Sequence, residues 1–297
     1  MTAGFIGLGA IGAPMATNIL ANGLHLTVWN RTASKTVALA EKGAAVAATP
    51  AGAAEDIVFT VLTDLPDVEQ VLAGPEGLLA GWAERGTRDP VLVVMGTVSP
   101  TAVRALAASL ADEHGVSVVD APVSGGDEGA RNGRLSIMVG GEADTVERLT
   151  PYFDAMGSTV RHLGPVGSGQ VAKSCNQIVV AATVIALAET FVYARQTGLD
   201  MEALAELLSG GLADSELLRQ KGWRLLRHDY AGGGALANQV KDLRFALDQA
   251  RELGVPLPGA AHSTQFFTSL MAMGYGHEDH TAAQRVFEML AGVEHDR

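Results

Sequence analysis

The first half of the 297-residue chain alternates short apolar runs with longer amphipathic segments. Each apolar run has four to six residues, and the runs are Gly4–Gly7, Leu26–Trp29, Ile57–Leu62, Val91–Met95 and Val116–Val119. Such runs are typical of parallel strands that are buried on both faces. The segments between them, at about 13–22, 33–42, 50–54, 67–81 and 101–114, have helical character. This alternation predicts an α/β fold with a doubly wound sheet.

The second half has a different pattern. One more strand is expected at Leu135–Val139 and one more helix at Ala143–Met156. After Gly169 the apolar residues recur at helical spacing, with helices expected at about 171–196, 201–209, 214–228, 238–253, 258–274 and 281–291. The glycine-rich stretch Gly164–Gly169 therefore predicts a boundary between a dinucleotide-binding domain, residues 1–165, and an all-helical domain, residues 166–297.

Charge and cysteine content exclude several classes of protein. Lys and Arg number 21 against 33 Asp and Glu, for a net charge of −12, and no basic run interrupts this balance. We therefore expect neither nucleic acid nor an anionic membrane as a partner. The single cysteine, Cys175, forms no internal disulfide and no Cys-based zinc site, and we expect no metal.

No segment of the sequence predicts a membrane span. The longest apolar run, residues 178–188, is shorter than the roughly 20 residues that a span requires. The N-terminal stretch GFIGLGAIGAPMA lacks the preceding positive charge of a signal peptide and is interrupted by glycines. We expect a soluble, cytoplasmic protein.

A glycine-rich loop follows the first predicted strand. The residues Gly7, Leu8, Gly9, Ala10, Ile11 and Gly12 match G-x-G-x-x-G, and a helix is expected from about Pro14. Alone the pattern is weak, and a tight turn without a ligand is the alternative. Between a strand and a helix, however, it predicts a site where backbone N–H groups at the helix N-terminus bind a dinucleotide pyrophosphate.

The end of the second predicted strand bears on which dinucleotide binds. An NAD enzyme usually has an acidic residue there, which bonds the ribose 2′-hydroxyl. This chain has Asn30, Arg31 and Thr32 instead. Asn30 bonds a phosphate without repelling it, and Arg31 forms bidentate bonds with a 2′-phosphate. The alternative is a solvent-exposed loop arginine. We favour NADP over NAD.

Two further stretches carry polar residues suited to a substrate site. Ser124, Gly125 and Gly126 offer a hydroxyl and uncovered backbone N–H groups to a small carboxylate, although Ser-Gly-Gly is also a common loop. Lys173 and Asn176 share one face of a helix that is otherwise rich in Ala, Val and Ile. Partial burial and the helix dipole are expected to lower the pKa of Lys173, as a general acid–base requires. A lysine extending to solvent from a helix start is the alternative.

Four motifs together resemble the β-hydroxyacid dehydrogenase family, which includes 3-hydroxyisobutyrate dehydrogenase, tartronate semialdehyde reductase and the glyoxylate/succinic semialdehyde reductases. They are GFIGLGAIGAPMATN, DAPVSGG with its continuation GARNGRLSIMVGG, GPVGSGQVAKSCNQ, and Lys241-Asp242. They occur in the family's order and cover essentially the whole chain. The resemblance implies a Rossmann-type domain followed by a helical domain.

The resemblance also implies roles for single residues. Lys173 is similar to the family's catalytic lysine, and Asn176 to an amide that orients the substrate. The carboxylate-binding stretch corresponds to Ser124, Gly125 and Gly126, with Asp242 added to the substrate set. Cofactor contacts are implied for Leu62 and Thr63 near the adenosine half, Thr97 near the nicotinamide ribose, and Lys241 from the helical domain.

This chain departs from the family pattern in two places. The strand end Val94-Met95-Gly96-Thr97 lacks the Asp and Ser that often precede the threonine. Family members often have a Phe seven residues before the Lys-Asp pair, lining the substrate pocket, where this chain has Gly234. The missing ring implies a wider or looser pocket.

The predicted activity is hydride transfer between NADP(H) and a small β-hydroxyacid or semialdehyde carboxylate, with Lys173 as general acid–base. An imine reductase of the same architecture is one alternative, although those proteins generally replace the lysine. A non-catalytic NADP-binding regulator is another. A 6-phosphogluconate-type enzyme is disfavoured, because its helical domain is larger than the one expected at residues 166–297. The apolar long helix, at about 171–196, predicts burial against another subunit, hence a homodimer or homotetramer.

Overall fold

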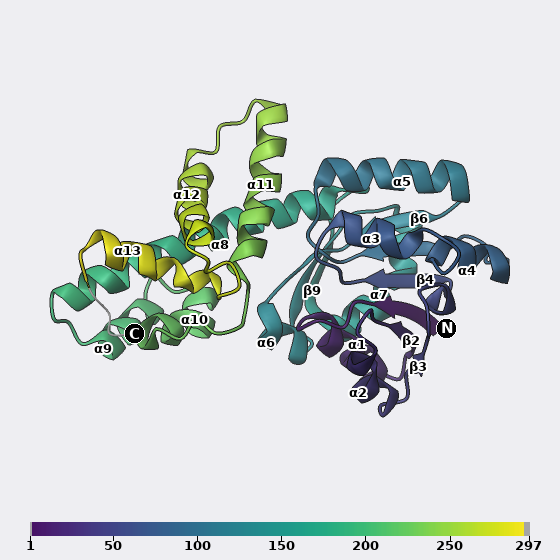
Figure 1. Ribbon diagram of the computed structural model, residues 1–297, viewed down its shortest axis with the longest axis horizontal. Helices are drawn as coiled ribbons and strands as arrows, with labels where there is room; N and C mark the ends of the chain where they lie inside the picture. The colour runs from purple at the N-terminus through teal and green to yellow at the C-terminus, as the bar shows by residue number, and fades with distance from the viewer. Residues whose placement is uncertain (1, 294–297) are drawn as a thin grey trace. The chain divides into compact units, whose positions relative to one another are not determined.

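The computed structural model describes residues 2–293 and divides into two compact units, Met1–Lys173 and Ser174–Arg297 (Figure 1). The first unit holds the sheets, and the second is built from helices. The division lies eight residues beyond the predicted boundary at 165/166, because the first turns of the long helix pack with the sheet unit.

The main sheet has six parallel strands in the order β3-β2-β1-β4-β5-β6. The strands are β1 (Thr2–Ile6), β2 (His25–Trp29), β3 (Ala45–Val46), β4 (Ile57–Thr60), β5 (Val91–Val94) and β6 (Ser117–Asp120). This is the strand order of a doubly wound dinucleotide-binding fold, and it confirms the predicted fold class. The order reverses between β1 and β4, so ligands of such sheets bind at the carboxyl ends of these strands.

Helices cover both faces of this sheet (Figure 1). They are α1 (Gly12–Ala21), α2 (Val37–Ala40), α3 (Leu65–Leu72), α4 (Leu78–Arg85), α5 (Pro100–His114), α6 (Gly126–Arg131) and α7 (Ala143–Met156), with the 3₁₀ turns η1 (Ala33–Thr36) and η2 (Ala51–Ala53). One buried cluster joins Phe5 and Phe59 to Met15 of α1 and Phe153 of α7. A second cluster on the other face includes Leu92 and Trp82. Burial on both faces explains the continuous apolar runs of the strands.

The predicted helix at 67–81 was wrong, since the chain forms two helices there. The residues between α3 and α4 contain Gly74, whose φ of +81° is incompatible with a continuing helix, followed by Pro75.

A second sheet has the order β7-β8-β9, with β7 (Val123–Ser124), β8 (Leu135–Val139) and β9 (Gly157–His162). Only β8 was expected. The strand β7 has two residues, too few for a periodic pattern, and β9 begins directly after α7. Pairing with β8 holds the stretch that contains Ser124 in an extended conformation.

The carboxylate of Asp120, the last residue of β6, binds the N-terminus of the long helix α8 (Ser168–Gln196). Its Oδ1 accepts a hydrogen bond from Gly167 N at 2.6 Å, and its Oδ2 accepts one from Gln170 N at 2.7 Å. A side chain from another element thus caps this helix. A Cβ on Gly169 would lie 2.2 Å from Met138 O, so glycine is required there.

The side chain of Gln170 ties the first turn of α8 to the loop after β5. Its Oε1 accepts from Val98 N at 3.0 Å, and its Nε2 donates to Gly96 O at 2.9 Å. Together with Asp120, this amide fixes the start of α8 on the sheet unit.

The helical unit contains the rest of α8 and the helices α9 (Met201–Ser209), α10 (Glu216–Arg227), α11 (Leu236–Leu253), α12 (Pro258–Ala272) and α13 (Gln284–Leu290), with the 3₁₀ turn η3 (His280–Ala283). Phe191, Leu225, Leu243 and Phe267 lie in its buried core. Between Ser174 and residue 293 no strand is formed, as predicted.

The helix α8 is long and apolar enough to cross a membrane by length and composition alone. Core helices of soluble domains have the same properties, and half of its most apolar window is buried inside the described structure.

The burial of Asp120 predicts a pH-dependent stability. Burial raises the pKa of Asp120 to about 6, above its ordinary value of 3.8 and against the lowering effect of its backbone hydrogen bonds. A raised pKa in the folded state stabilises the fold at low pH, and the contribution is lost as pH rises through about 6. When the pH falls from about 7 to about 4.5, the unfolding free energy of the native protein should therefore rise by about 2 kcal/mol relative to that of Asp120→Asn, whose side chain does not titrate.

Urea unfolding of both proteins at the two pH values measures this difference. If the unfolding free energies of the two proteins differ by the same amount at both pH values, the raised pKa of Asp120 is contradicted.

Candidate active site

The glycine-rich loop joins β1 to α1 in a conformation that glycine alone permits. Gly7 has a φ of +99°, and a Cβ on Gly12 would lie 1.9 Å from Gly7 O. Gly9 differs, because a Cβ there would meet nothing within 4 Å. Gly7 and Gly12 therefore shape the loop, whereas Gly9 leaves its outer side open to a ligand.

A hollow of about 390 Å³ lies beside this loop. It is lined by Gly9, Ala10, Ala13, Pro14, Thr17, Lys42 and Arg131. No side chain caps the N-terminus of α1, so backbone N–H groups of its first turn remain for a ligand. An uncapped helix start, an open glycine and two cations suit a diphosphate, and these residues fit a dinucleotide.

Lys42 and Arg131 were not predicted from the sequence. Lys42 follows α2 and Arg131 ends α6, and no spacing in the sequence indicates that both approach the loop.

The loop after β2 is held by Asn30. Its Oδ1 accepts from Leu8 N at 2.9 Å, and its Nδ2 donates to Thr32 O at 3.0 Å. Asn30 thus joins this loop to the glycine-rich loop, a role different from the predicted phosphate contact. Arg31 and Thr32 are exposed, and both are accessible to a ligand.

Leu62, Thr63 and Thr97 follow the carboxyl ends of β4 and β5. A Cβ on Gly96 would lie 1.9 Å from Leu62 O, so the loops after these two strands touch. The structure therefore brings the three predicted cofactor contacts to the sheet edge that bears the glycine-rich loop.

Lys173 lies beside the Ser-Gly-Gly stretch within the sheet unit. Its Nζ donates a hydrogen bond to Val123 O, the residue before Ser124, at 2.8 Å, and Lys173 is only 8% exposed. Gly125 and Gly126 have φ values of +130° and +66°, which glycine adopts without strain. The buried ammonium group of Lys173, in the first turns of α8, therefore lies close to the end of β7, where Ser124 carries its hydroxyl group.

The remaining predicted residues meet within the helical unit. Asn176 Nδ2 donates to Gln177 Oε1 at 2.9 Å, and Gln177 Nε2 donates to Asp242 Oδ2 at 2.7 Å. Lys241 Nζ lies 3.1 Å from Asp242 Oδ1 and over the ring of Phe245. Gln177 thus links two residues that were predicted separately.

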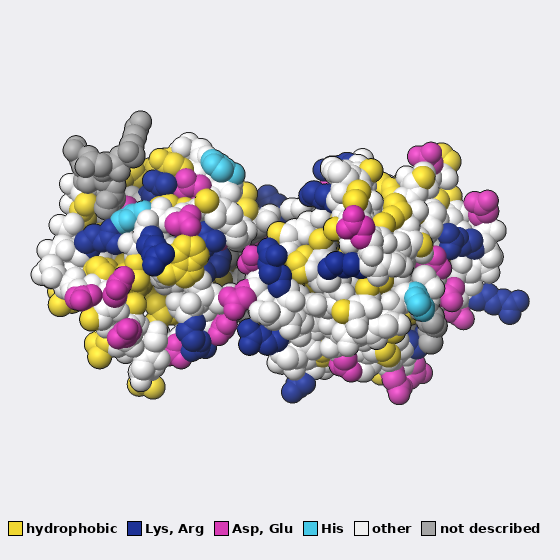
Figure 2. All heavy atoms as spheres, turned by 90° about the horizontal axis from the view of Figure 1, so that it is seen from below, with side chains coloured by type: hydrophobic (Ala, Val, Ile, Leu, Met, Phe, Trp, Pro, Cys, Tyr) yellow, Lys and Arg dark blue, Asp and Glu magenta, His cyan; other side chains and the backbone are white. Residues whose placement is uncertain are grey.

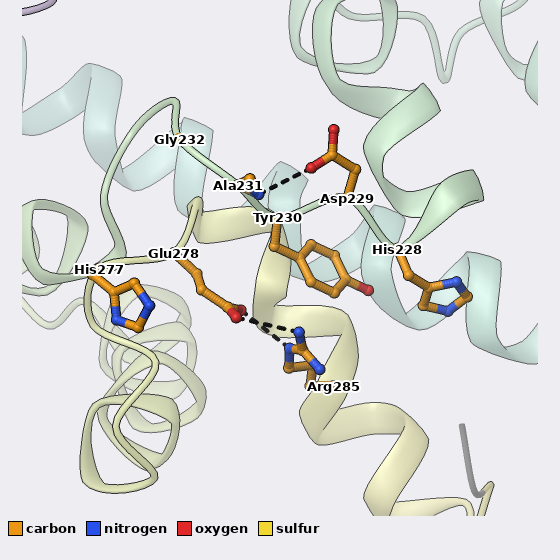
Figure 3. A pocket seen from close by; sticks show the side chains of 8 residues that line it. All are labelled: His228, Asp229, Tyr230, Ala231, Gly232, His277, Glu278 and Arg285. Atoms are coloured by element: carbon orange, nitrogen blue, oxygen red, sulfur yellow. Dashed lines mark hydrogen bonds and ion pairs between the residues drawn. The ribbon is translucent and has the colours of Figure 1, made fainter. Parts of the chain in front are cut away.

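A cavity of about 440 Å³ lies elsewhere in the helical unit (Figure 3). It is lined by His228, Asp229, Tyr230, Ala231, Gly232, His277, Glu278 and Arg285, none of which was predicted as a site residue. The guanidinium of Arg285 packs over the rings of Tyr230 and Tyr275 and forms two hydrogen bonds with Glu278. Arg285 and Glu278 are thus paired with each other, which is typical of a structural cluster.

Between residues 2 and 293 no group of three or more His, Cys, Asp or Glu side chains has the arrangement of a metal site. On the face shown in Figure 2, basic and acidic side chains are intermingled on each unit.

Both parts of the chain match known families. Residues 2–164 match the NAD binding domain of 6-phosphogluconate dehydrogenase, and residues 167–287 match the family described as NAD-binding of NADP-dependent 3-hydroxyisobutyrate dehydrogenase. This chain is a member of the β-hydroxyacid dehydrogenase family. The resemblance predicted from the motifs is confirmed.

Individual relatives span nearly the whole chain. The 2-(hydroxymethyl)glutarate dehydrogenase of Eubacterium barkeri is 37% identical and covers 98% of this chain and 96% of its own. The 2-hydroxy-3-oxopropionate reductase of Escherichia coli is 36% identical and covers 98% of each. The crystal structure of a 3-hydroxyisobutyrate dehydrogenase from Salmonella typhimurium has a TM-score of 0.87 at 26% identity, covering 96% of this chain and 99% of its own.

As a β-hydroxyacid dehydrogenase, the protein is an NAD(P)-dependent oxidoreductase that acts on the CH–OH group of small carboxylate substrates. It binds a nicotinamide cofactor.

Substitutions at two of the loop glycines should cause two different kinds of defect. Gly12→Ala should destabilise the fold by about 2 kcal/mol or more, because its methyl group collides with Gly7 O. Gly9→Ala should leave stability unchanged but weaken cofactor binding by roughly tenfold, because its methyl group projects into the open side of the loop. Thermal unfolding and NADPH fluorescence titration measure the two effects. Equal cofactor affinity in Gly9→Ala and the native protein would contradict the assigned site.

Proposed function

We propose that the protein interconverts a small β-hydroxyacid and its semialdehyde with NADP(H), and that Lys173 is the general acid–base. The observation that supports this most strongly is the hydrogen bond from Lys173 Nζ to Val123 O, which holds a buried ammonium group beside Ser124. A lysine that merely extends to solvent from a helix start would be exposed.

When bound, the cofactor supplies or accepts the hydride. Reduction of a carbonyl also consumes one proton at the oxygen, and Lys173 Nζ donates it. In oxidation, Lys173 takes the proton from the hydroxyl group as the hydride leaves the carbon. Because Lys173 is 8% exposed, bulk water has little access to its ammonium group.

The substrate carboxylate is assigned to Ser124, Gly125 and Gly126. The Ser124 hydroxyl and the backbone N–H groups of the two glycines are donors that bind a carboxylate. Asp127 and Glu128 follow in the sequence, but each is paired with an arginine, Arg131 and Arg134 respectively. Asn176 and Asp242 are proposed to orient the substrate, and Lys241 to contact the cofactor.

We propose NADP as the preferred cofactor. The end of β2 carries no carboxylate. Arg31 is exposed in the loop after β2, which the hydrogen bonds of Asn30 hold in place. A guanidinium group there matches a 2′-phosphate in charge and geometry.

An imine reductase is the alternative within oxidoreductases, and a non-catalytic NADP-binding regulator is the alternative outside them. The buried, hydrogen-bonded position of Lys173 favours an enzyme over a regulator. The presence of a lysine there disfavours an imine reductase, because those proteins generally replace it. The named substrates of two relatives, a glutarate with two carboxylates and an oxopropionate with one, leave the particular acid open.

We also propose that the protein is a homodimer or homotetramer. Within α8, the exposed residues Cys175, Val179, Ala182, Ala186, Glu189 and Tyr193 recur at intervals of three or four and form one stripe, in which Glu189 is the one charged residue. Val179 and Tyr193 are 65% and 71% exposed in the single chain, and a second copy would cover them.

Lys173→Ala should lower kcat by at least about 10²-fold, since general acid–base assistance contributes about 10²- to 10⁴-fold. The assay is NADPH oxidation with glyoxylate and with succinic, methylmalonic and tartronic semialdehydes, and a cyclic imine tests the alternative. Arg148→Ala, an exposed substitution on α7, is the control. Undiminished turnover in Lys173→Ala would exclude the assigned role, and imine-only turnover would favour the imine reductase.

Arg31→Ala should reduce the preference for NADPH over NADH, expressed as a ratio of kcat/KM values, by roughly 10- to 100-fold. The loss should fall on NADPH, because NADH lacks the 2′-phosphate. Equal losses with both cofactors would contradict the proposed contact.

A further inference from the structure

A buried glutamine in the sheet unit bonds both peptide groups that flank Thr97. Gln170, in the first turn of α8, is only 1% exposed. Its Oε1 accepts from Val98 N at 3.0 Å, and its Nε2 donates to Gly96 O at 2.9 Å. The first bond fixes the peptide group after Thr97, and the second fixes the one before it. Since φ and ψ are the soft dihedral angles of a residue, the two bonds together set the backbone conformation of Thr97.

The position of Thr97 gives this conformation a consequence for the cofactor. Thr97 follows the carboxyl end of β5, and ligands of doubly wound sheets bind at this edge. A Cβ on Gly96 would lie 1.9 Å from Leu62 O, so the loop after β4 also packs against this backbone. Thr97 itself is partly exposed. Its backbone is therefore confined, while the residue reaches the surface at the edge where the cofactor binds.

Gln170 and Lys173 lie on the same face of α8. They are three residues apart, a spacing at which helical side chains are neighbours. The backbone of this turn is held by Asp120, whose Oδ2 accepts from Gln170 N at 2.7 Å. Lys173 Nζ reaches Val123 O at 2.8 Å. One turn of the helix thus holds both the loop of Thr97 and the proposed general acid–base.

The two bonds require an amide at position 170. Gly96 O only accepts a hydrogen bond and Val98 N only donates one, so the side chain between them needs one donor and one acceptor. An ionised carboxylate has no donor, and a thioether offers only a weak acceptor. The same two bonds define the orientation of the amide, with Nε2 toward Gly96 and Oε1 toward Val98.

Capping of the helix does not require this side chain. Asp120 bonds two N–H groups at the N-terminus of α8, those of Gly167 and Gln170. Arg104 Nε donates to Val166 O, just before the helix, at 3.2 Å. Both bonds of the Gln170 amide go instead to the loop after β5. What the amide adds is therefore the connection between that loop and the turn that leads to the lysine.

We propose that Gln170 is a positioning residue for hydride transfer, which aligns Thr97, the expected contact of the nicotinamide ribose, with Lys173. This inference rests on the proposed function. All three residues belong to the compact unit Met1–Lys173. At 1% exposure, Gln170 touches no reacting atom and acts through the two residues that it aligns. Because the hydride and the proton go to the two atoms of one carbonyl group, an error in this alignment slows the reaction.

The test measures the rate constant of hydride transfer in single turnovers. Enzyme in excess over NADPH is mixed with saturating glyoxylate or succinic, methylmalonic or tartronic semialdehyde, whichever the native enzyme reduces fastest, and NADPH absorbance is followed by stopped flow. Gln170→Met removes both bonds, and Gln170→Glu places a carboxylate beside Gly96 O. Both should lower the rate constant by roughly 10- to 100-fold. The NADPH dissociation constant should change by less than about threefold, because the diphosphate site at the glycine-rich loop is intact.

The rate constant separates positioning from a loss of folded protein. A smaller folded fraction leaves fewer active sites, but each site turns over at the native rate, so the rate constant of a single turnover does not change. Gln70→Met, which replaces an exposed glutamine on α3 of the same unit, is the control and should leave both quantities at their native values. The near-isosteric Gln170→Glu keeps the test decisive if Gln170→Met does not fold.

The outcomes separate this inference from the proposed function. Native rate constants in both Gln170 variants, or weaker NADPH binding with an unchanged rate constant at saturation, would overturn the role of Gln170 and leave the proposed function intact. If neither variant folds, Gln170 contributes to stability instead, and the inference is overturned in the same way. Failure of the native enzyme to reduce any of the acids would contradict the proposed function itself, and this inference with it.

Discussion

The position of Lys173 depends on one carboxylate at the end of a strand. Asp120 accepts hydrogen bonds from Gly167 N and Gln170 N, and it thereby fixes the first turn of α8 to β6. Lys173 lies one turn further along the helix, where its Nζ reaches Val123 O. Asp120 and Val123 are three residues apart in the sequence, so the same short segment holds the helix and receives the lysine.

Close backbone approach then explains the glycines around this point. A Cβ on Gly140 or Gly169 would meet Asp120 oxygens at 2.5 or 2.8 Å, and one on Gly96 would meet Leu62 O. These contacts bring the ends of β4, β5 and β6 to one edge of the sheet, together with the glycine-rich loop. The glycine-rich loop, the stretch Ser124–Gly126 and the buried Lys173 are therefore parts of one compact unit, whereas Asn176, Lys241 and Asp242 belong to a second polar network in the helical unit.

The sequence predicts those features that local pattern determines. Buried parallel strands and helices of the second half are periodic enough to recognise, and α9 lies at 201–209 as expected. Short elements such as β7 are too short to show a periodic pattern. Gly74 and Pro75 interrupt the helix that the apolar pattern of residues 67–81 predicts. Contacts between distant residues were not predictable either: nothing in the spacing of Asp120 indicates that it caps α8, and nothing near Gln170 indicates that it bonds Gly96 and Val98.

We propose above that Lys173 exchanges a proton with the substrate oxygen beside Ser124. A crystal structure of the ternary complex with NADP⁺ and a β-hydroxyacid tests it most directly. We expect Lys173 Nζ within about 3 Å of the substrate hydroxyl oxygen. The substrate carboxylate should bind the Ser124 hydroxyl and the N–H group of Gly125 or Gly126. A hydroxyl oxygen bound by another side chain, with Lys173 bonded only to Val123 O, would contradict it.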